Sequence, residues 1–177
     1  YSRIGGFEIY LSRPELGSSL WETILEAGRS ENIRPGSPNI IDRVEAGLLS
    51  FGNEMTVENT PLECNMDKFL DINKEADYIG KKVLQRQIRY GIKRRIRGVI
   101  YKGPKLPTIS RPLQVFDIDK RTIIGSLTSG AFSPHFKRNI GVGMIKYGYW
   151  DNDKKILVNI ADQEFREGLI KDLPLVQ

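Results

Sequence analysis

The chain has 177 residues, a net charge of +5, 40% hydrophobic residues and 28% charged residues. This balance is that of an ordinary soluble globular protein with a sizeable core, long enough for one large domain or two small ones. No apolar run approaches the ~18 residues of a membrane span, and the mild positive charge is not that of a dedicated nucleic-acid binder. We therefore expect neither a membrane nor a nucleic acid as a partner.

The chain has one cysteine, Cys64, and one histidine, His135. A single cysteine excludes an internal disulfide and suits a reducing compartment, so we expect a cytoplasmic location. The pair is too small a ligand set for a zinc site, and we expect no metal. We also expect Cys64 to be a buried small apolar residue rather than a nucleophile.

The first stretch, "YSRIGGFEIYLS", has the alternation of a β-strand, with Phe7, Ile9 and Leu11 on one face. A strand needs a partner, and no residue precedes this one. We therefore expect the chain to be the C-terminal part of a longer polypeptide or one piece of a cleaved one. The alternative is a native N-terminal edge strand.

Three helices and a short strand are predicted next. The first helix is expected to be capped by Ser18 or Ser19, to end near Gly28 and to bury Trp21 in the core. The second begins at about residue 39, with Ile40, Val44 and Leu48 as its apolar stripe. The third covers about 75–90 and ends at Gly91. A strand is predicted at 68–70.

From residue 92 the pattern changes to short β runs separated by turn signals. The runs lie at 93–102, 112–117, 122–127, 139–147, 155–161 and 164–170. Their regular spacing predicts a small antiparallel barrel or sandwich. The Ser/Thr/Gly-rich stretch 126–134 is predicted to be a loop. We place a domain boundary near 91–93, which separates a first domain, 1–91, from a second, 92–177.

Glu8 is the candidate ligand-binding residue in this pattern. Gly5 and Gly6 precede it, and glycines there permit close approach of a ligand or another backbone. A carboxylate flanked by the hydroxyls of Tyr1 and Tyr10 can accept a pair of N–H groups from a heterocycle. The alternative is a plain polar face of a strand.

A basic cluster follows near the predicted boundary, formed by Arg86, Arg89, Lys93, Arg94, Arg95 and Arg97. It has the charge to contact phosphates or a polyanionic tail. The alternative, a solvated surface, is favoured because no aromatic stacking platform accompanies the charges in the sequence.

Several motifs together resemble the folate-binding superfamily of the glycine-cleavage T-protein, the aminomethyltransferases. They are "YSRIGGFEIY", "RVEAGLLSFGNEMTVENTPLE", "DYIGKKVL" and "GSLTSGAFSPHFKRNIGVGMI", in collinear order over essentially the whole chain. The resemblance implies an α+β fold, in which the C-terminal part of a T-protein-like folate-binding α/β domain is followed by a small antiparallel β-barrel domain.

Within that superfamily, the segment "SPNIIDRVEAGLLSFGN" is similar to the branch of dimethylsulfoniopropionate demethylases. T-proteins carry a ligand-contacting arginine where Asn39 stands here. Tyr1 departs from the demethylase pattern, which has a tryptophan at that position beside the substrate sulfonium. Tryptophan is the better cation–π partner, so Tyr1 bears on the identity of the substrate.

The resemblance implies tetrahydrofolate as the cofactor, with Glu8, Tyr10, Tyr1 and Asn39 as its binding residues. It implies methyl transfer from a small-molecule donor, dimethylsulfoniopropionate or a similar sulfonium, to N5 of the folate. The catalytic residues are expected in the remaining N-terminal part of the same polypeptide, and a homodimer is possible. The alternatives are a T-protein-type aminomethyltransferase, a non-catalytic folate-binding regulator, and an RNA-associated barrel module.

Overall fold

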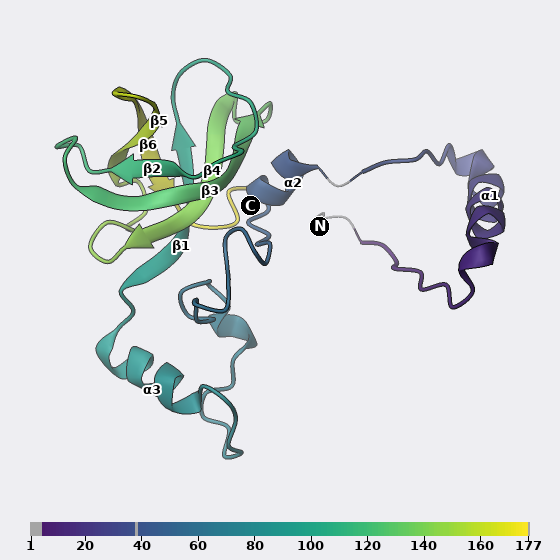
Figure 1. The fold of residues 1–177 in the computed structure, drawn as a ribbon, viewed down its shortest axis with the longest axis horizontal. Coiled ribbons are helices and arrows are strands. Elements are labelled where there is room, and N and C mark those ends of the chain that lie inside the picture. Colours follow the sequence, from purple (N-terminus) through teal and green to yellow (C-terminus); the bar gives the residue numbers. More distant parts are fainter. Residues whose placement is uncertain (1–4, 38, 177) are drawn as a thin grey trace.

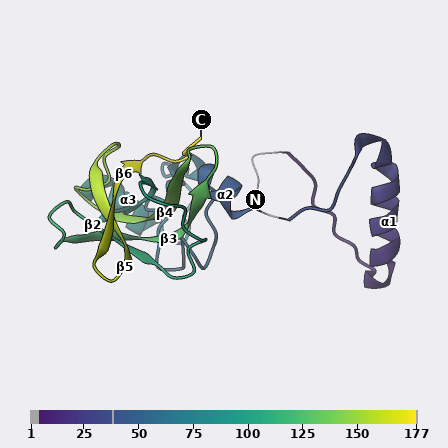
Figure 2. The ribbon, with the colours of Figure 1, turned by 90° about the horizontal axis from the view of Figure 1, so that it is seen from above.

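The computed structural model describes residues 5–37 and 39–176. They form two regions, which Figures 1 and 2 show from two directions. Residues 5–37 form an arm that extends away from the rest of the molecule. Residues 39–176 form a body made of a six-stranded barrel and the segments packed on it. We call these regions the arm and the body.

The arm contains the first helix, α1 (Gly17–Ala27), between two 3₁₀ turns, η1 (Pro14–Leu16) and η2 (Arg29–Glu31). Gly28 is its C-cap, as predicted. The predicted serine cap is wrong, because the helix starts at Gly17 without a side-chain cap. Trp21 is also not in a core, since 51% of it is exposed. The helix therefore forms as its sequence predicts but packs little of its apolar face.

The predicted N-terminal strand is not formed in residues 5–12, and residues 1–4 lie outside the described residues. Phe7 is 99% exposed and Tyr10 is 88% exposed. The alternation of the segment suits a strand, but a strand is stable only when its backbone groups pair with a neighbour. No described strand lies beside residues 5–12 to supply that pairing.

The body begins with α2 (Ile40–Glu45), which is shorter than predicted. Gly47 ends it with a φ of +66°, so Leu48 lies beyond the helix rather than on its stripe. The predicted strand at 68–70 is wrong, since Asp67–Phe69 is the 3₁₀ turn η3. The third helix, α3 (Lys81–Tyr90), ends at Gly91 as predicted but starts later.

Six strands follow, one for each predicted β run. They are β1 (Arg94–Tyr101), β2 (Leu113–Phe116), β3 (Ile123–Ser133), β4 (Arg138–Lys146), β5 (Lys155–Ala161) and β6 (Glu164–Lys171). All neighbours are antiparallel, and the order β1-β4-β3-β2-β5-β6 closes because β6 pairs with β1. Closure leaves the sheet without a free edge. The predicted α+β fold with an antiparallel barrel is confirmed.

The predicted loop at 126–134 is wrong, because β3 continues through it to Ser133. Ser, Thr and Gly favour turns in isolation. Here β2 and β4 supply hydrogen bonds on both sides of β3, and this outweighs the local preference. Within this Ser/Thr/Gly-rich stretch, the β3–β4 register has an irregularity between Leu127 and Ser129.

The core fills the barrel, with Val99, Val115, Ile124, Leu127, Ile145, Val158 and Ile170 fully buried. A second cluster joins α2 to the barrel wall through Val44, Ile96, Ile140 and Val142. α2 is therefore fixed on the barrel, whereas α1 is distant from it (Figure 1). No helix in the described part of the chain is long and apolar enough to cross a membrane.

Candidate functional site

Glu8 and Tyr10 come together on the arm. The Tyr10 hydroxyl donates a hydrogen bond to Oε2 of Glu8 at 2.6 Å. This bond, more than the slight burial, raises the pKa of Tyr10 above its ordinary value. Both side chains face solvent, and Tyr10 is the only described donor to this carboxylate. Toward the rest of the described residues, Glu8 therefore keeps acceptor positions that further N–H groups can use. Tyr1, the other predicted flank, lies outside the described residues.

Gly5 and Gly6 lie in the open part of the arm. A Cβ atom built on either glycine meets no atom within 4 Å. The predicted close approach at these glycines therefore has no partner among the described residues.

Asn39 caps α2. Its side-chain oxygen accepts a hydrogen bond from the backbone N–H of Ile41 at 2.9 Å. An asparagine at this position satisfies an otherwise unpaired N–H group at the start of the helix. No hydrogen bond or ion pair within residues 5–37 and 39–176 joins Asn39 to Glu8. The three predicted binding residues that the structure describes thus form one pair and one helix cap rather than a single cluster.

A buried ion pair, which the sequence analysis missed, fixes α2 on the barrel. Nη1 of Arg43 lies 2.8 Å from Oε2 of Glu54, and Nη2 donates to Oγ of Ser129 in β3 at 2.7 Å. The side chain of Glu54 is fully buried and that of Arg43 is 9% exposed. The backbone N–H of Ser50 also donates to Glu54, at 2.7 Å. A buried pair of charges is tolerated only when its remaining polar atoms are satisfied, as they are here.

The protonation of Glu54 follows from these contacts. Burial alone raises the pKa of this carboxyl, but hydrogen bonds from Arg43, Ser129 and the Ser50 N–H, with the Arg43 charge, outweigh it. The pKa of Glu54 is therefore held below its ordinary value, and Glu54 is ionised at neutral pH. It serves as the counter-ion of Arg43 rather than as a proton donor.

A second contact joins the motifs that contain Arg43 and Ser129, "RVEAG" and "TSGAFS". Oγ of Ser133, which is fully buried, donates to Oε1 of Glu45 at 2.5 Å. The same hydroxyl accepts the backbone N–H of Phe136 at 3.0 Å. The "RVEAG" and "TSGAFS" motifs are thus partners across the junction of α2 and β3. The sequence shows each motif separately, and only the structure shows that the two are in contact.

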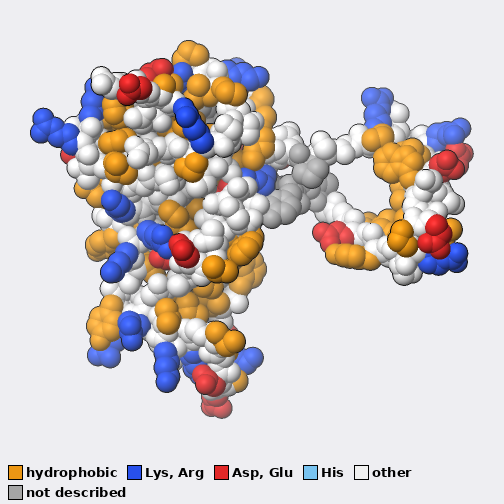
Figure 3. Space-filling model, viewed as in Figure 1, with side chains coloured by type: hydrophobic (Ala, Val, Ile, Leu, Met, Phe, Trp, Pro, Cys, Tyr) orange, Lys and Arg blue, Asp and Glu red, His pale blue; other side chains and the backbone are white. Residues whose placement is uncertain are grey.

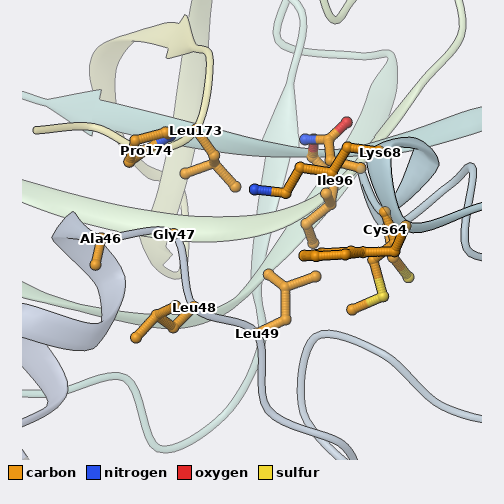
Figure 4. A pocket seen from close by; sticks show the side chains of 12 residues that line it. Ala46, Gly47, Leu48, Leu49, Cys64, Lys68, Ile96, Leu173 and Pro174 are labelled. Atoms are coloured by element: carbon orange, nitrogen blue, oxygen red, sulfur yellow. The ribbon is translucent and has the colours of Figure 1, made fainter. Parts of the chain in front are cut away.

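A cavity of about 420 Å³ lies beside this junction, between the segment after α2, the η3 region, β1 and the C-terminal segment. Figure 4 shows Leu48 and Leu49 on one side of it and Leu173 and Lys68 on the other. Its walls are mainly apolar, and the Lys68 ammonium lies 5.0 Å from the centre of the Phe69 ring. The cavity has the size and character of a small-molecule pocket.

Cys64 lies in the wall of this cavity and is only 4% exposed. Burial, followed by the nearby Glu63 charge, raises the pKa of its thiol. The thiol is therefore neutral at physiological pH and a poor nucleophile. The expectation that Cys64 is a buried apolar residue is confirmed.

The basic cluster divides in the structure. Arg94, Arg95 and Arg97 form ion pairs with Glu63, Asp67 and Asp172 respectively. Within the described residues no ion pair joins Arg86, Arg89 or Lys93 to a carboxylate. The strand arginines therefore hold the 58–67 segment and the C-terminal segment to the barrel. Within the same residues, the members of the cluster without a carboxylate partner are the two arginines of α3 and Lys93, which precedes β1.

Comparison with known proteins identifies both parts of the chain. Residues 1–74 match the family model of the GCVT N-terminal domain. Residues 94–175 match that of the glycine cleavage T-protein C-terminal barrel domain. The chain belongs to the glycine cleavage T-protein superfamily. The two motifs that meet at the α2–β3 junction lie one in each matched region, "RVEAG" in 1–74 and "TSGAFS" in 94–175.

Individual members of the superfamily differ in activity. A dimethylsulfoniopropionate demethylase of Ruegeria pomeroyi is 41% identical over 150 residues, which are 85% of this chain and 40% of the relative. An aminomethyltransferase of Caldanaerobacter subterraneus is 37% identical over 89% of this chain and 42% of the relative. That of Geobacillus is 34% identical over 96% of this chain and 46% of the relative. The chain thus spans less than half the length of these relatives.

The fold also matches a solved structure. The crystal structure of the glycine cleavage system aminomethyltransferase T from Bartonella henselae superimposes with a TM-score of 0.74. The match covers 92% of this chain and 44% of that one, at 21% sequence identity. At that identity the match establishes the fold alone.

Proposed function

We propose that this chain is the C-terminal part of a tetrahydrofolate-dependent demethylase that takes a methyl group from dimethylsulfoniopropionate or a similar sulfonium. The single observation that carries the proposal is the exposed Glu8 carboxylate, which within the described residues accepts a hydrogen bond from Tyr10 alone, in a chain of the T-protein superfamily. A carboxylate with open acceptor positions fits the paired N–H groups of a pterin ring.

The bound folate would supply N5 as the methyl acceptor. Glu8 would fix the orientation of the pterin through two charge-assisted hydrogen bonds, and Tyr10 would line the same wall. N5 would form a bond to the methyl carbon while the methyl–sulfur bond breaks with its electron pair going to sulfur, so a neutral thioether leaves and the N5 proton is released to solvent. Such a leaving group needs little acid assistance, and the residues of the chain contribute mainly by alignment. The products would be 5-methyltetrahydrofolate and methylthiopropionate.

Asn39 departs from the T-protein pattern. T-proteins carry an arginine here that contacts the ligand, whereas Asn39 is neutral and is engaged in capping α2. This departure and the 41% identity to the Ruegeria demethylase both support a sulfonium donor.

We propose that upstream residues of the same polypeptide supply the other walls of the site and its catalytic groups. The arm exposes apolar side chains that a folded protein normally covers, with Phe7 99% and Ile9 61% exposed. The matched relatives are more than twice as long as this chain. A homodimer is a further possible arrangement of the complete protein.

A second function, aminomethyl transfer, has its own support. Aminomethyltransferases match at 34% and 37% identity and over 96% and 89% of this chain, compared with 85% for the demethylase. In that function the donor is an aminomethyl group on a lipoyl carrier, and the products are a methylene-folate and ammonia. The same Glu8 would hold the pterin in either reaction, so the two functions differ in the donor.

The test uses the polypeptide extended upstream to the length of its relatives. It is mixed with tetrahydrofolate and dimethylsulfoniopropionate, and methylthiopropionate and 5-methyltetrahydrofolate are quantified by mass spectrometry. We expect both products in equal amounts. Turnover of an aminomethyl-lipoyl carrier with none of the sulfonium would overturn the demethylase proposal, and folate binding without any turnover would favour a regulator.

The role of Glu8 is tested by the variant Glu8→Gln. Loss of a charge-assisted hydrogen-bonding partner should weaken folate binding about ten- to hundredfold in titration calorimetry. Glu15→Gln is the matched control, because Glu15 is also exposed on the arm and pairs with Arg13. Unchanged affinity in Glu8→Gln would show that the pterin lies elsewhere.

A further inference from the structure

The structure contains a second candidate binding site, far from the arm. A groove of about 1010 Å³ runs between the C-terminal half of α3 and the adjoining ends of β1 and β4. Its walls include Arg86, Gln87, Tyr90, Lys93, Lys146 and Tyr147. Figure 3 shows Lys and Arg side chains and apolar side chains interspersed over this part of the body. The groove shares no lining residue with the cavity of Figure 4.

Local geometry brings these residues together. Arg86 and Tyr90 are separated by one helical turn and lie on the same face of α3. Gly91 ends the helix with a φ of +84° and turns the chain into β1. The backbone N–H of Tyr147 donates to the carbonyl oxygen of Lys93 at 2.9 Å. The β1–β4 pairing therefore places Tyr147 beside the basic start of β1.

Two exposed aromatic rings flank the groove, which answers the objection raised by the sequence. Tyr90 is 73% exposed and Tyr147 is 71% exposed. The Tyr147 ring is held by an edge contact with Trp150, at 5.2 Å between ring centres, and the Arg89 guanidinium lies 5.3 Å from the centre of the Tyr90 ring. These rings are positioned and accessible, as a platform for stacking requires.

The charges and the aromatic rings of the groove indicate the ligand. Arg86 and Lys93 have no carboxylate partner within the described residues, and the one acidic residue of the wall, Glu63, is buried and paired with Arg94. Cations suit phosphates, and exposed rings suit bases.

We propose that this groove binds single-stranded nucleic acid. Arg86, Lys93 and Lys146 contact the phosphates, and Tyr90 and Tyr147 stack on bases. The binding is largely independent of sequence, since stacking and phosphate contacts are available to every nucleotide. It is also independent of the folate site, because the groove lies on the body and Glu8 lies on the arm.

Fluorescence anisotropy with a labelled 20-nucleotide single-stranded RNA of mixed sequence tests the proposal, using the full chain. We expect saturable binding that weakens roughly twentyfold between 50 and 200 mM salt, the value for three phosphate contacts on a single strand. Tyr90→Ala and Tyr147→Ala should each weaken binding about tenfold. The double variant Arg86→Ala/Lys93→Ala should flatten the salt dependence.

The control variants remove side chains of the same kind, aromatic or cationic, from other parts of the chain. Phe7→Ala removes an exposed ring from the arm, and Lys105→Ala/Arg111→Ala removes two cations from the segment after β1, at the opposite end of that strand. Both should bind RNA like the unsubstituted chain. Circular dichroism melting curves establish that all variants are folded.

Three results would overturn the proposal. One is the absence of RNA binding at 50 mM salt. Another is displacement of RNA by an oligoglutamate of equal charge together with unchanged binding in both tyrosine variants, since the groove would then be only a basic surface. The third is tyrosine-dependent binding of adenosine monophosphate with no binding of RNA, which would make the groove a mononucleotide site.

Discussion

The arm and the body are built from similarly patterned sequence but differ in how much of it they bury. The body closes its sheet into a barrel and satisfies even a buried ion pair with hydrogen bonds from three segments. The arm leaves Phe7, Tyr10 and Trp21 exposed. An amphipathic pattern therefore specifies which side of a segment is apolar, but stability comes only when another segment covers that side.

The largest expected effect in this comparison is at the buried ion pair. Glu54→Gln keeps the shape of the side chain but leaves the Arg43 guanidinium buried without a counter-ion. We expect a loss of about 3–5 kcal/mol of unfolding free energy in urea denaturation. Glu167→Gln is the control, because the Lys102–Glu167 pair is about 70% exposed on both sides and should contribute far less to the unfolding free energy. Equal effects would show that the junction does not depend on this pair.

A glycine substitution compares the packing of the two regions directly. A Cβ on Gly143 in β4 would lie 1.8 Å from the Ser126 carbonyl oxygen, whereas one on Gly6 meets nothing within 4 Å. Gly143→Ala should therefore destabilise the body by about 1–3 kcal/mol or more, and Gly6→Ala should have almost no effect on its melting temperature. A destabilising Gly6→Ala would show that the arm is packed on something in solution.

Acid should weaken the body through Glu54. Its pKa is lower in the folded protein than in the unfolded chain, so its stabilising contribution is complete above the unfolded value of about 4.3. The contribution is lost as pH falls from there through the folded pKa. Urea midpoints measured from pH 6 to pH 3 should show this loss in the unsubstituted chain. In Glu54→Gln that component of the pH dependence should be absent.

The smallest expected effect is on the arm. Trp21→Ser changes a half-exposed ring on α1, which lies away from the barrel (Figure 2). It should change the unfolding free energy of the body by less than about 0.5 kcal/mol. In the polypeptide extended upstream, the same substitution should cost several times more, because we propose that the arm packs there. An equal effect in both would contradict that proposal.

The sequence predicted most of the local structure and less of the candidate site. Every barrel strand was foreseen, because alternation is a local property that each run carries by itself. The end of α3 at Gly91 was foreseen because a glycine that stops a helix is also a local signal. The loop predicted at 126–134 failed because the hydrogen bonds of β2 and β4 are not visible in the composition of β3.

The contacts of the site residues likewise divide into local ones, which the sequence predicts, and long-range ones, which it does not. Glu8 and Tyr10 are two residues apart, so their contact follows from local spacing. The contacts of Arg43 with Ser129 and of Glu45 with Ser133 join residues far apart in sequence. Each of these residues lies in a recognisable motif. Neither motif, however, indicates that the other is its contact partner.

The sequence by itself determined the superfamily, the six β runs and the acidic side chain proposed to bind folate, because these depend on residue identity and short-range order. Only the tertiary structure decided which charges are paired, where β3 ends and that Tyr147 lies beside Lys93. The reason is physical. Burial, ion pairing and strand pairing depend on what lies across a contact, and that partner is often distant in the chain.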